Sequence, residues 1–215
     1  MLSLISTPIG NLDDISLRAI DVIKSADLIY TEDTRSFKKI LDSIECKKKC
    51  KSFHEHNEDI ICKEIIKHLK NKKHVVLTCE AGTPAISDPG YKLIRECLNL
   101  NLKYTLIPGP SSLINAVVLS GLPTDKFSFY GFIPKKSNAQ QKLFQKVSND
   151  EKTAIMFESV KRLRKTIISI SKHLDNNRRI SVCREMTKIH EQIVQGNCED
   201  LLKKIDDGSL PLKGE

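Results

Sequence analysis

The chain has 215 residues, 40% of them hydrophobic, with 35 Lys plus Arg against 27 Asp plus Glu and a net charge of +8. That length suits two α/β units of about 100–120 residues each. The charge favours a polyanionic partner such as RNA, although a solvated basic surface gives the same count. No apolar stretch approaches the roughly 18 residues of a membrane span, and the seven Cys form no CxxC pair, so we expect a cytoplasmic protein with free thiols.

Short apolar strands alternate with amphipathic helices along the first half of the chain. The predicted strands are Leu2–Ser6, Leu28–Thr31, His74–Cys79 and Tyr104–Ile107. The predicted helices are Leu17–Ala26, Phe37–Ile44, Ile60–Leu69, Tyr91–Leu98 and Ser111–Ser120. This alternation predicts an α/β fold with crossover units and a largely parallel sheet.

The pattern changes after the turn-rich segment Gly121-Leu-Pro-Thr-Asp125, where we place a domain boundary between residues 1–121 and 122–215. Strands are predicted at Phe127–Ile133, Thr153–Glu158, Arg179–Arg184 and His190–Gln195. Helices are predicted at Gln140–Val147, Arg162–Leu174 and from an Asn197 cap through Ile205. The second domain is therefore also α/β.

Three predicted strands end in loops rich in Gly, Pro, Ser and Thr. The loops are Thr7–Asn11, Glu80–Gly90 and Pro108–Ser112. Carboxyl ends of strands are where open α/β sheets bind ligands, and Gly lets the main chain approach a ligand closely. Such loops can hold a nucleoside and an amino-acid group through main-chain hydrogen bonds.

Motifs for several other ligand classes are absent. The chain has no GxGxxG, no GxxxxGK[ST] and no HExxH. A zinc site built on Cys46, Cys50, His54 and His56 does not match the usual knuckle spacing, so we expect no metal.

Eight segments, in order along the chain, carry a resemblance to a known family. They are Thr7-Pro-Ile-Gly-Asn-Leu-Asp-Asp-Ile-Ser-Leu-Arg-Ala19, Glu32-Asp-Thr-Arg35, Phe53-His-Glu-His-Asn57, Ala81-Gly-Thr-Pro84, Ser87-Asp-Pro-Gly90, Pro108-Gly-Pro-Ser111, Ser120-Gly-Leu-Pro123 and Arg184-Glu-Met-Thr-Lys188. Together they resemble the tetrapyrrole-methylase superfamily and, within it, the RsmI-type 16S rRNA (cytidine-2′-O)-methyltransferases. Glu80 stands where that branch usually has Asp.

The resemblance implies two α/β domains with S-adenosylmethionine in the cleft between them. It also implies a homodimer and, as substrate, a cytidine of the decoding centre in the small ribosomal subunit. Relatives of this type continue into a final strand, so we expect residues 122–215 to lack that strand. By position, the resemblance implies cofactor contacts from Pro8, Ala81, Gly82, Thr83, Ile86, Ser87, Ser112, Leu113, Phe157 and Met186.

The tetrad His54-Glu55-His56-Asn57 brings together four consecutive side chains that can transfer protons or form hydrogen bonds. Histidine suits proton transfer and phosphate contact at neutral pH, so His54, Glu55 and His56 are candidates for the catalytic group and Asn57 for substrate contact. The alternative is a helix start capped by Asn57, with hydrogen-bonding histidines. The residues alone do not identify the general base.

Basic side chains near predicted strand ends are candidates for RNA phosphate contacts. They are Arg35, Lys135, Lys136, Arg184 and Lys188. Arg162 and Arg164 are expected instead on an exposed helix face.

The leading hypothesis is an S-adenosylmethionine-dependent rRNA methyltransferase. A tetrapyrrole methyltransferase of the same fold, and a non-catalytic RNA-binding assembly protein, are the alternatives. The net charge of +8 and the tetrad weigh against the tetrapyrrole substrate.

Overall fold

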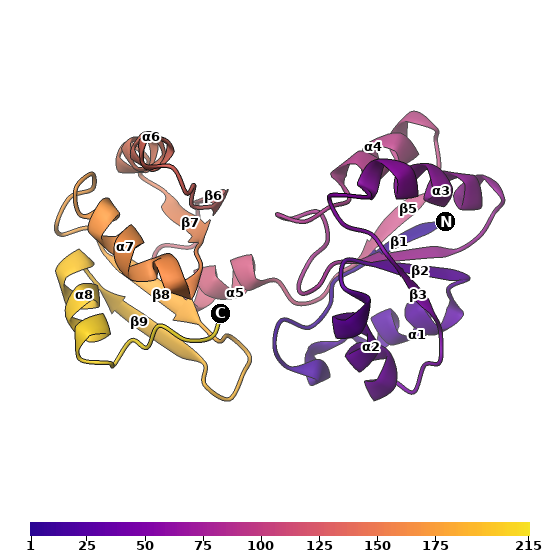
Figure 1. Ribbon diagram of the computed structural model, residues 1–215, viewed down its shortest axis with the longest axis horizontal. Coiled ribbons are helices and arrows are strands. Elements are labelled where there is room, and N and C mark those ends of the chain that lie inside the picture. The colour runs from indigo at the N-terminus through magenta and orange to yellow at the C-terminus, as the bar shows by residue number, and fades with distance from the viewer. The chain divides into compact units, whose positions relative to one another are not determined.

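The computed structural model describes all 215 residues and divides into two compact units, Met1–Ser111 and Ser112–Glu215 (Figure 1). The second unit begins before helix α5 (Ser112–Leu119), whereas the sequence suggested a boundary after that helix. Hydrogen bonds explain the difference. The carbonyl of Ala116 accepts from the thiol of Cys183 at 3.8 Å, and the carbonyl of Ser120 accepts from Nε2 of Gln195 at 2.7 Å.

The first unit is built on one parallel sheet, as the alternating pattern predicted. Its five strands lie in the order β3-β2-β4-β1-β5, and every neighbouring pair is parallel. Their bounds are β1 (Leu2–Ile5), β2 (Leu28–Thr31), β3 (Cys50–Ser52), β4 (Val75–Thr78) and β5 (Tyr104–Ile107). Strands of three or four residues suffice because helices bury both faces of the sheet.

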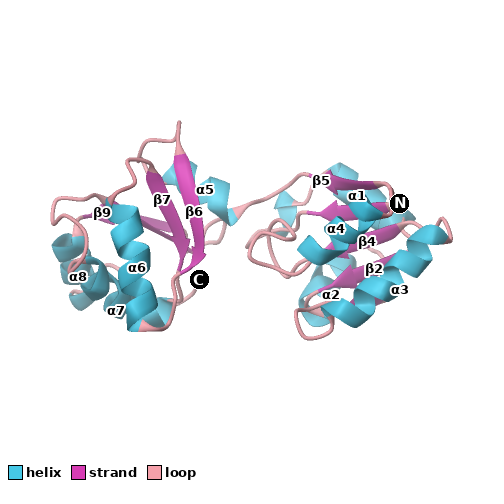
Figure 2. Ribbon diagram, turned by 90° about the horizontal axis from the view of Figure 1, so that it is seen from above, coloured by secondary structure: helices cyan, strands magenta, loops and turns pink.

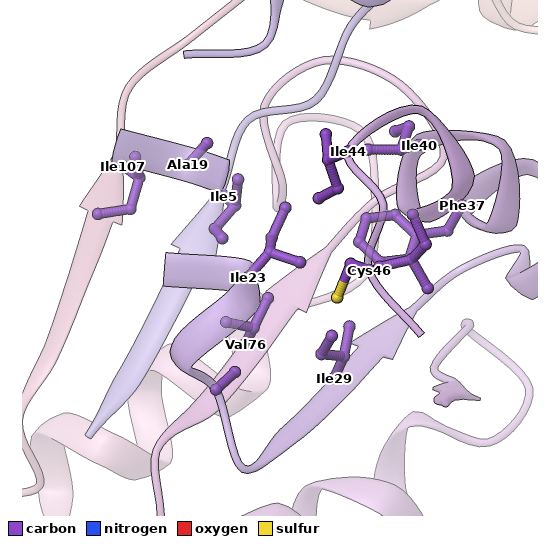
Figure 3. Close-up of a cluster of buried hydrophobic side chains, with 12 residues drawn as sticks. Ile5, Ala19, Ile23, Ile29, Phe37, Ile40, Ile44, Cys46, Val76 and Ile107 are labelled. Atoms are coloured by element: carbon purple, nitrogen blue, oxygen red, sulfur yellow. The ribbon is translucent and has the colours of Figure 1, made fainter. Parts of the chain in front are cut away.

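Helices cover both faces of this sheet (Figures 1 and 2). On one face, α1 (Leu17–Ser25) and α2 (Thr34–Ser43) follow β1 and β2, and a short 3₁₀ turn, η1 (Leu12–Asp14), precedes α1. Figure 3 shows the core on this face, where Ile23, Phe37 and the strand residues Ile29 and Val76 pack together. On the other face, α3 (Glu58–Lys70) and α4 (Tyr91–Asn99) pack onto Tyr30 and Leu77.

The strand order creates a switch point at the carboxyl edge. Strand β4 lies between β2 and β1. The chain leaves β1 and β2 toward the α1/α2 face, but it leaves β4 toward the α4 face. Connections that diverge to opposite faces open a crevice between neighbouring strands, where α/β folds bind ligands. This places the loops after β1 and β4 at the expected ligand position.

The second unit contains two small sheets. Strands β6 (Phe127–Phe132) and β7 (Thr153–Phe157) pair in parallel, and β8 (Ile180–Arg184) and β9 (Gln192–Gly196) form an antiparallel hairpin. Its remaining helices are α6 (Ser137–Ser148), α7 (Val160–Ile170) and α8 (Cys198–Asp206). The core includes Phe144, Ile167, Val194, Leu201 and Leu210.

Element positions in the second unit differ from the predicted ones at several ends. Helix α6 begins at Ser137 rather than Gln140, because its first three residues, Ser137, Asn138 and Ala139, include no large apolar side chain to mark the helix in the sequence. His190 lies in the loop before β9 rather than in the strand. Asn197 caps α8 as predicted, through a reciprocal capping box with Asp200. In neither unit is any helix both long and apolar enough to cross a membrane.

Candidate functional site

Three loops at the carboxyl edge of the first sheet are joined by hydrogen bonds. Thr7 and Gly82 form an isolated antiparallel bridge in which each N–H donates to the other's carbonyl, at 2.9 and 3.0 Å. The hydroxyl of Thr83 lies 3.1 Å from Oγ of Ser6 and donates to the carbonyl of Pro110 at 3.3 Å. The Gly/Pro/Ser/Thr-rich segments that follow β1, β4 and β5 thus form one layer.

Gly82 is central to this layer. Its φ of +83° is a conformation that residues with a Cβ rarely adopt, and a Cβ there would point at Cγ2 of Ile9, 3.4 Å away, and at the carbonyl of Pro110. Both separations are ordinary van der Waals contacts, so the positive φ, rather than a lack of space, is what favours glycine at this position. Pro8 is buried beside this bridge, whereas Ala81, Ile86 and Ser87 are exposed and Thr83 is half-buried.

The loop after β4 is held in an unusual conformation. Ala85 and Ser87 both have positive φ, 67° and 66°. The buried thiol of Cys79 donates to the carbonyls of Ala81 and Gly82, each at 3.3 Å. Backbone strain of this kind persists only when surrounding contacts enforce it, and it concentrates at ligand sites.

Three buried threonine hydroxyls at this edge have no hydrogen-bond partner. They belong to Thr7, which follows β1, and to Thr31 and Thr78, which end β2 and β4. Thr31 and Thr78 follow the paired residues Tyr30 and Leu77, so they stand on adjacent strands. A buried hydroxyl without a partner calls for a ligand or an ordered water.

The tetrad His54–Asn57 forms a turn between β3 and α3. The side chain of Asn57 accepts from the N–H of His54 at 2.9 Å and donates to the carbonyl of Ser52 at 3.2 Å. The rings of His54 and His56 lie 5.8 Å apart, edge to face, and Glu55 and His56 are exposed. Nδ1 of His54 is buried without a partner. Asn57 therefore shapes the turn, and it offers α3 no side-chain cap hydrogen bond.

Glu58, the next residue, links the tetrad to the loop after β4. Only 8% of Glu58 is exposed, and its Oε1 accepts from the N–H of Gly90 at 3.0 Å. Gly90 stands at the start of α4 with a φ of +133° and no side-chain cap of its own. The carboxylate of α3 thus caps the neighbouring helix α4.

Carboxylates also gather at this edge. Burial, reinforced by the charge of Asp88, raises the pKa of Glu32, and burial together with the charge of Glu80 raises the pKa of Asp88. Carboxylates with raised pKa values in such a position suit proton transfer. Sequence reasoning did not single out either residue, although both stand within the motif segments Glu32–Arg35 and Ser87–Gly90.

Arg35 lies at the start of α2 with its side chain 90% exposed. Nη2 forms an ion pair with Oδ2 of Asp33 at 2.9 Å, and this pairing lowers the pKa of Asp33 to about 2. Asp33 also caps α2 by accepting from the N–H of Arg35 at 2.7 Å. The guanidinium is held at the carboxyl edge, available to solvent but partly neutralised.

The other four cofactor candidates lie in the second unit. Ser112 and Leu113 begin α5 and are half-buried. Phe157 ends β7, with its ring 5.0 Å from that of Phe129. Met186 lies between Glu185 and Thr187, which both have positive φ, 51° and 67°. That φ is uncommon for a β-branched residue, so the loop around Met186 is strained.

The basic candidates of the second unit differ in exposure. Lys135 and Lys136 are exposed in the loop between β6 and α6. Arg184 is only 8% exposed, and its guanidinium donates to Oε1 of Gln192 and to the carbonyl of Lys213. Lys188 forms ion pairs with Glu185 and Glu215. In this arrangement Arg184 is internal and Lys188 is paired with carboxylates, so neither of these two candidate phosphate contacts presents an unpaired charge to solvent.

Arg162 differs from its predicted position. It was expected on a solvated helix face, but its guanidinium donates to the carbonyls of Ile133 and Pro134, at 3.0 and 2.8 Å. Arg164, from the same segment, does lie exposed and pairs with Asp206. Sequence offered no signal to separate the two, because the carbonyls that Arg162 contacts lie on a distant strand end.

Comparisons with known proteins give the family. A family model described as "Tetrapyrrole (Corrin/Porphyrin) Methylases" matches residues 1–202. A Rickettsia prowazekii protein named "Ribosomal RNA small subunit methyltransferase I" is 41% identical over 214 residues, which cover 100% of this chain and 75% of that protein. Proteins of the same name from Hydrogenobaculum sp. and Thermotoga maritima are 39% and 38% identical, with 100% and 95% of this chain and 92% and 91% of their own length covered. The chain therefore belongs to the tetrapyrrole methylase family, a family of methyltransferases, and to the branch of it formed by proteins of that name.

Proposed function

We propose that this methyltransferase transfers a methyl group from S-adenosylmethionine to the ribose 2′-hydroxyl of a cytidine in the decoding centre of 16S rRNA. The observation that carries the proposal is the likeness, along the whole chain, to relatives named for the small-subunit ribosomal RNA. The net charge of +8 supports it, because phosphate contacts release counterions. The proposed partner is the small ribosomal subunit, so we propose that the enzyme works in the cytoplasm. We also propose that it is a homodimer, as its resemblance to the family implies.

The loops at the carboxyl edge of the first sheet are the proposed cofactor site. Main-chain groups of the Ala81–Ser87 loop, with the unpaired hydroxyls of Thr7 and Thr78, would bind the polar groups of S-adenosylmethionine. Pro8, Gly82 and Thr83 would shape this site, and Ser112, Leu113, Phe157 and Met186 are the proposed contacts from the second unit. S-adenosylmethionine supplies an electrophilic methyl group when bound. The contribution of the chain is then to orient the acceptor, and positioning alone is worth about 7–11 kcal/mol.

The ribose hydroxyl must lose its proton during transfer. Two kinds of acceptor stand at the carboxyl edge of the first sheet. His54 has a buried Nδ1 without a partner, and Glu32 and Asp88 have raised pKa values. A general base of either kind contributes typically about 10²–10⁴-fold. Glu55 and His56, both exposed, are proposed to contact the RNA substrate next to the general base.

Exposed cations are the proposed phosphate contacts. Arg35 offers its guanidinium at the first sheet's carboxyl edge, and Lys135 and Lys136 offer ammonium groups in the second unit. Because Arg184 is internal and Lys188 is paired, we propose that they shape the loop around Met186.

A substrate comparison tests the proposal. The full chain is incubated with labelled S-adenosylmethionine and either unmodified small ribosomal subunits or uroporphyrinogen-type tetrapyrroles. Label in the ribosomal RNA alone is the expected result, and label in the tetrapyrrole alone would overturn it. Calorimetric titration with S-adenosylmethionine tests the alternative of a non-catalytic RNA-binding protein, which predicts no heat of cofactor binding.

A further inference from the structure

Arg162, on the first turn of α7, fastens the loop that follows β6. Its Nη1 donates to the carbonyl of Ile133 at 3.0 Å and its Nη2 to that of Pro134 at 2.8 Å. Nη1 also lies 3.2 Å from Oε1 of Glu158, one turn earlier. The side chain of Glu158 is 8% exposed and that of Arg162 is 27% exposed. A largely desolvated carboxylate thus orients the guanidinium toward two successive carbonyls.

The surrounding network leaves this arrangement little freedom. Oε2 of Glu158 accepts from the hydroxyl of buried Thr166 at 2.6 Å. The carbonyl of Pro134 receives a second donor, Nε2 of Gln140 on α6, at 2.8 Å. Charge-assisted bonds from a planar guanidinium are strong and direction-specific, and an ammonium group cannot reproduce the fork.

The same network reaches the candidate cofactor residue Phe157. The N–H of Ile133 donates to the carbonyl of Phe157 at 3.0 Å, and Glu158 follows Phe157 directly. Lys135 and Lys136, which follow Pro134, are exposed. The backbone that carries the two lysines is therefore fixed next to the end of β7, while their charges face solvent.

We propose that the Glu158–Arg162 pair is a positioning device that holds Lys135 and Lys136 ready to bind phosphates of the RNA substrate. This inference rests on the proposed function. A loop fixed before binding loses less conformational entropy on binding, so the same two contacts give higher affinity. Arg162 acts through the loop rather than by touching RNA. Its charge is already paired with Glu158, in contrast to the exposed pair that Arg164 makes with Asp206.

The test is a double-mutant cycle in the full chain. Arg162→Lys keeps the charge and removes the fork, and Lys135→Ala/Lys136→Ala removes the phosphate contacts. Arg164→Lys is the matched control on the same helix. Affinity for unmodified small ribosomal subunits, affinity for S-adenosylmethionine and thermal unfolding are measured for each variant. Gln140→Leu, which removes the other donor to Pro134, replaces Arg162→Lys if that variant does not fold.

Arg162→Lys is expected to weaken subunit binding by roughly three- to tenfold, the scale of coupling within one hydrogen-bond network. Its cofactor affinity stays at the parental value, Arg164→Lys changes neither affinity, and Arg162→Lys adds nothing once both lysines are gone. The inference would be overturned if Arg162→Lys weakened subunit binding by the same factor with and without the two lysines. It would also be overturned if Arg162→Lys, or the Lys135→Ala/Lys136→Ala variant, bound the subunit with the parental affinity. Failure of the proposed function is a separate result, because the parent chain would then not methylate the subunit at all.

Discussion

The backbone N–H of Thr7 donates to the carbonyl of Gly82, and the N–H of Gly82 donates back to the carbonyl of Thr7. This reciprocal pair joins the loops after β1 and β4, which lie on adjacent strands. A change of backbone conformation in one loop therefore displaces the other. The free hydroxyl of Thr7 lies at the junction, so we expect cofactor affinity to depend on the bridge.

Gly82→Ala is expected to weaken cofactor binding. A residue with a Cβ at a φ of +83° costs about 1–2 kcal/mol, and relaxation of that strain would pull the bridge apart. Gly208→Ala is the control, because Gly208 has a φ of +81° and open space around the added carbon. Both variants should lose stability in thermal unfolding, but only Gly82→Ala should lose affinity in calorimetry. Equal cofactor affinities for the two variants would show that cofactor binding does not depend on the Thr7–Gly82 bridge.

Glu58→Ala is expected to destabilise the fold by about 1–3 kcal/mol, because it leaves the N–H of Gly90 buried without an acceptor. Glu58→Gln keeps an acceptor and should recover most of that loss. Lys92→Met removes the ion pair with Glu58, 3.6 Å long, together with a shorter one to Asp59, 2.8 Å long, and Asp59→Asn, which removes only the second pair, is compared with it to isolate the charge contact of Glu58. Chemical denaturation measures all four variants. A Gln variant as unstable as the Ala variant would show that charge, not the cap, is what Glu58 contributes.

Asp33→Asn is expected to raise affinity for RNA. Asn keeps the cap on α2 but frees Arg35 from its ion pair. Arg35→Ala should have the opposite effect and lower the slope of log affinity against log salt by roughly 0.7–0.9. Binding to unmodified small subunits across a salt series gives both values. An unchanged slope in Arg35→Ala would exclude Arg35 as a phosphate contact.

The pKa shifts of Glu32 and Asp88 predict a pH dependence of stability. Burial raises the pKa of both carboxyls in the folded chain, so their ionisation opposes folding at neutral pH. As pH falls through the raised pKa values toward the unfolded values near about 4, that cost disappears. Glu32→Gln/Asp88→Asn should therefore melt at a higher temperature than the parent at neutral pH. The advantage should vanish below about pH 4. An equal advantage at both pH values would indicate a packing effect instead.

The sequence predicted those parts of the fold that depend on local pattern. Strand β2 has the predicted bounds, Leu28–Thr31, because its apolar run is short and sharply bounded. The Gly- and Pro-rich loops could be assigned to a single edge, because parallel strands bring their carboxyl ends together. The Thr7–Gly82 bridge bears out that expectation in geometry.

What could not be predicted depends on contacts between distant residues. Arg162 and Arg164 are identical in type and lie on one helix, yet only Arg162 meets carbonyls from the end of β6. Arg184 looked like a phosphate ligand at a strand end, but the C-terminal segment supplies an acceptor that draws it inside. Charge and spacing describe what a side chain can bind, whereas burial decides whether it is free to bind.

The central claim is methyl transfer to a ribose of small-subunit RNA, and mapping the product tests it most directly. Unmodified small ribosomal subunits are incubated with the full chain and S-adenosylmethionine, and the RNA is cleaved with alkali. A 2′-O-methyl group protects the adjoining phosphodiester, because the 2′-oxygen can no longer attack it. The account predicts one protected position, at a cytidine of the decoding centre. Methylation on a base, or label confined to a tetrapyrrole, would contradict it.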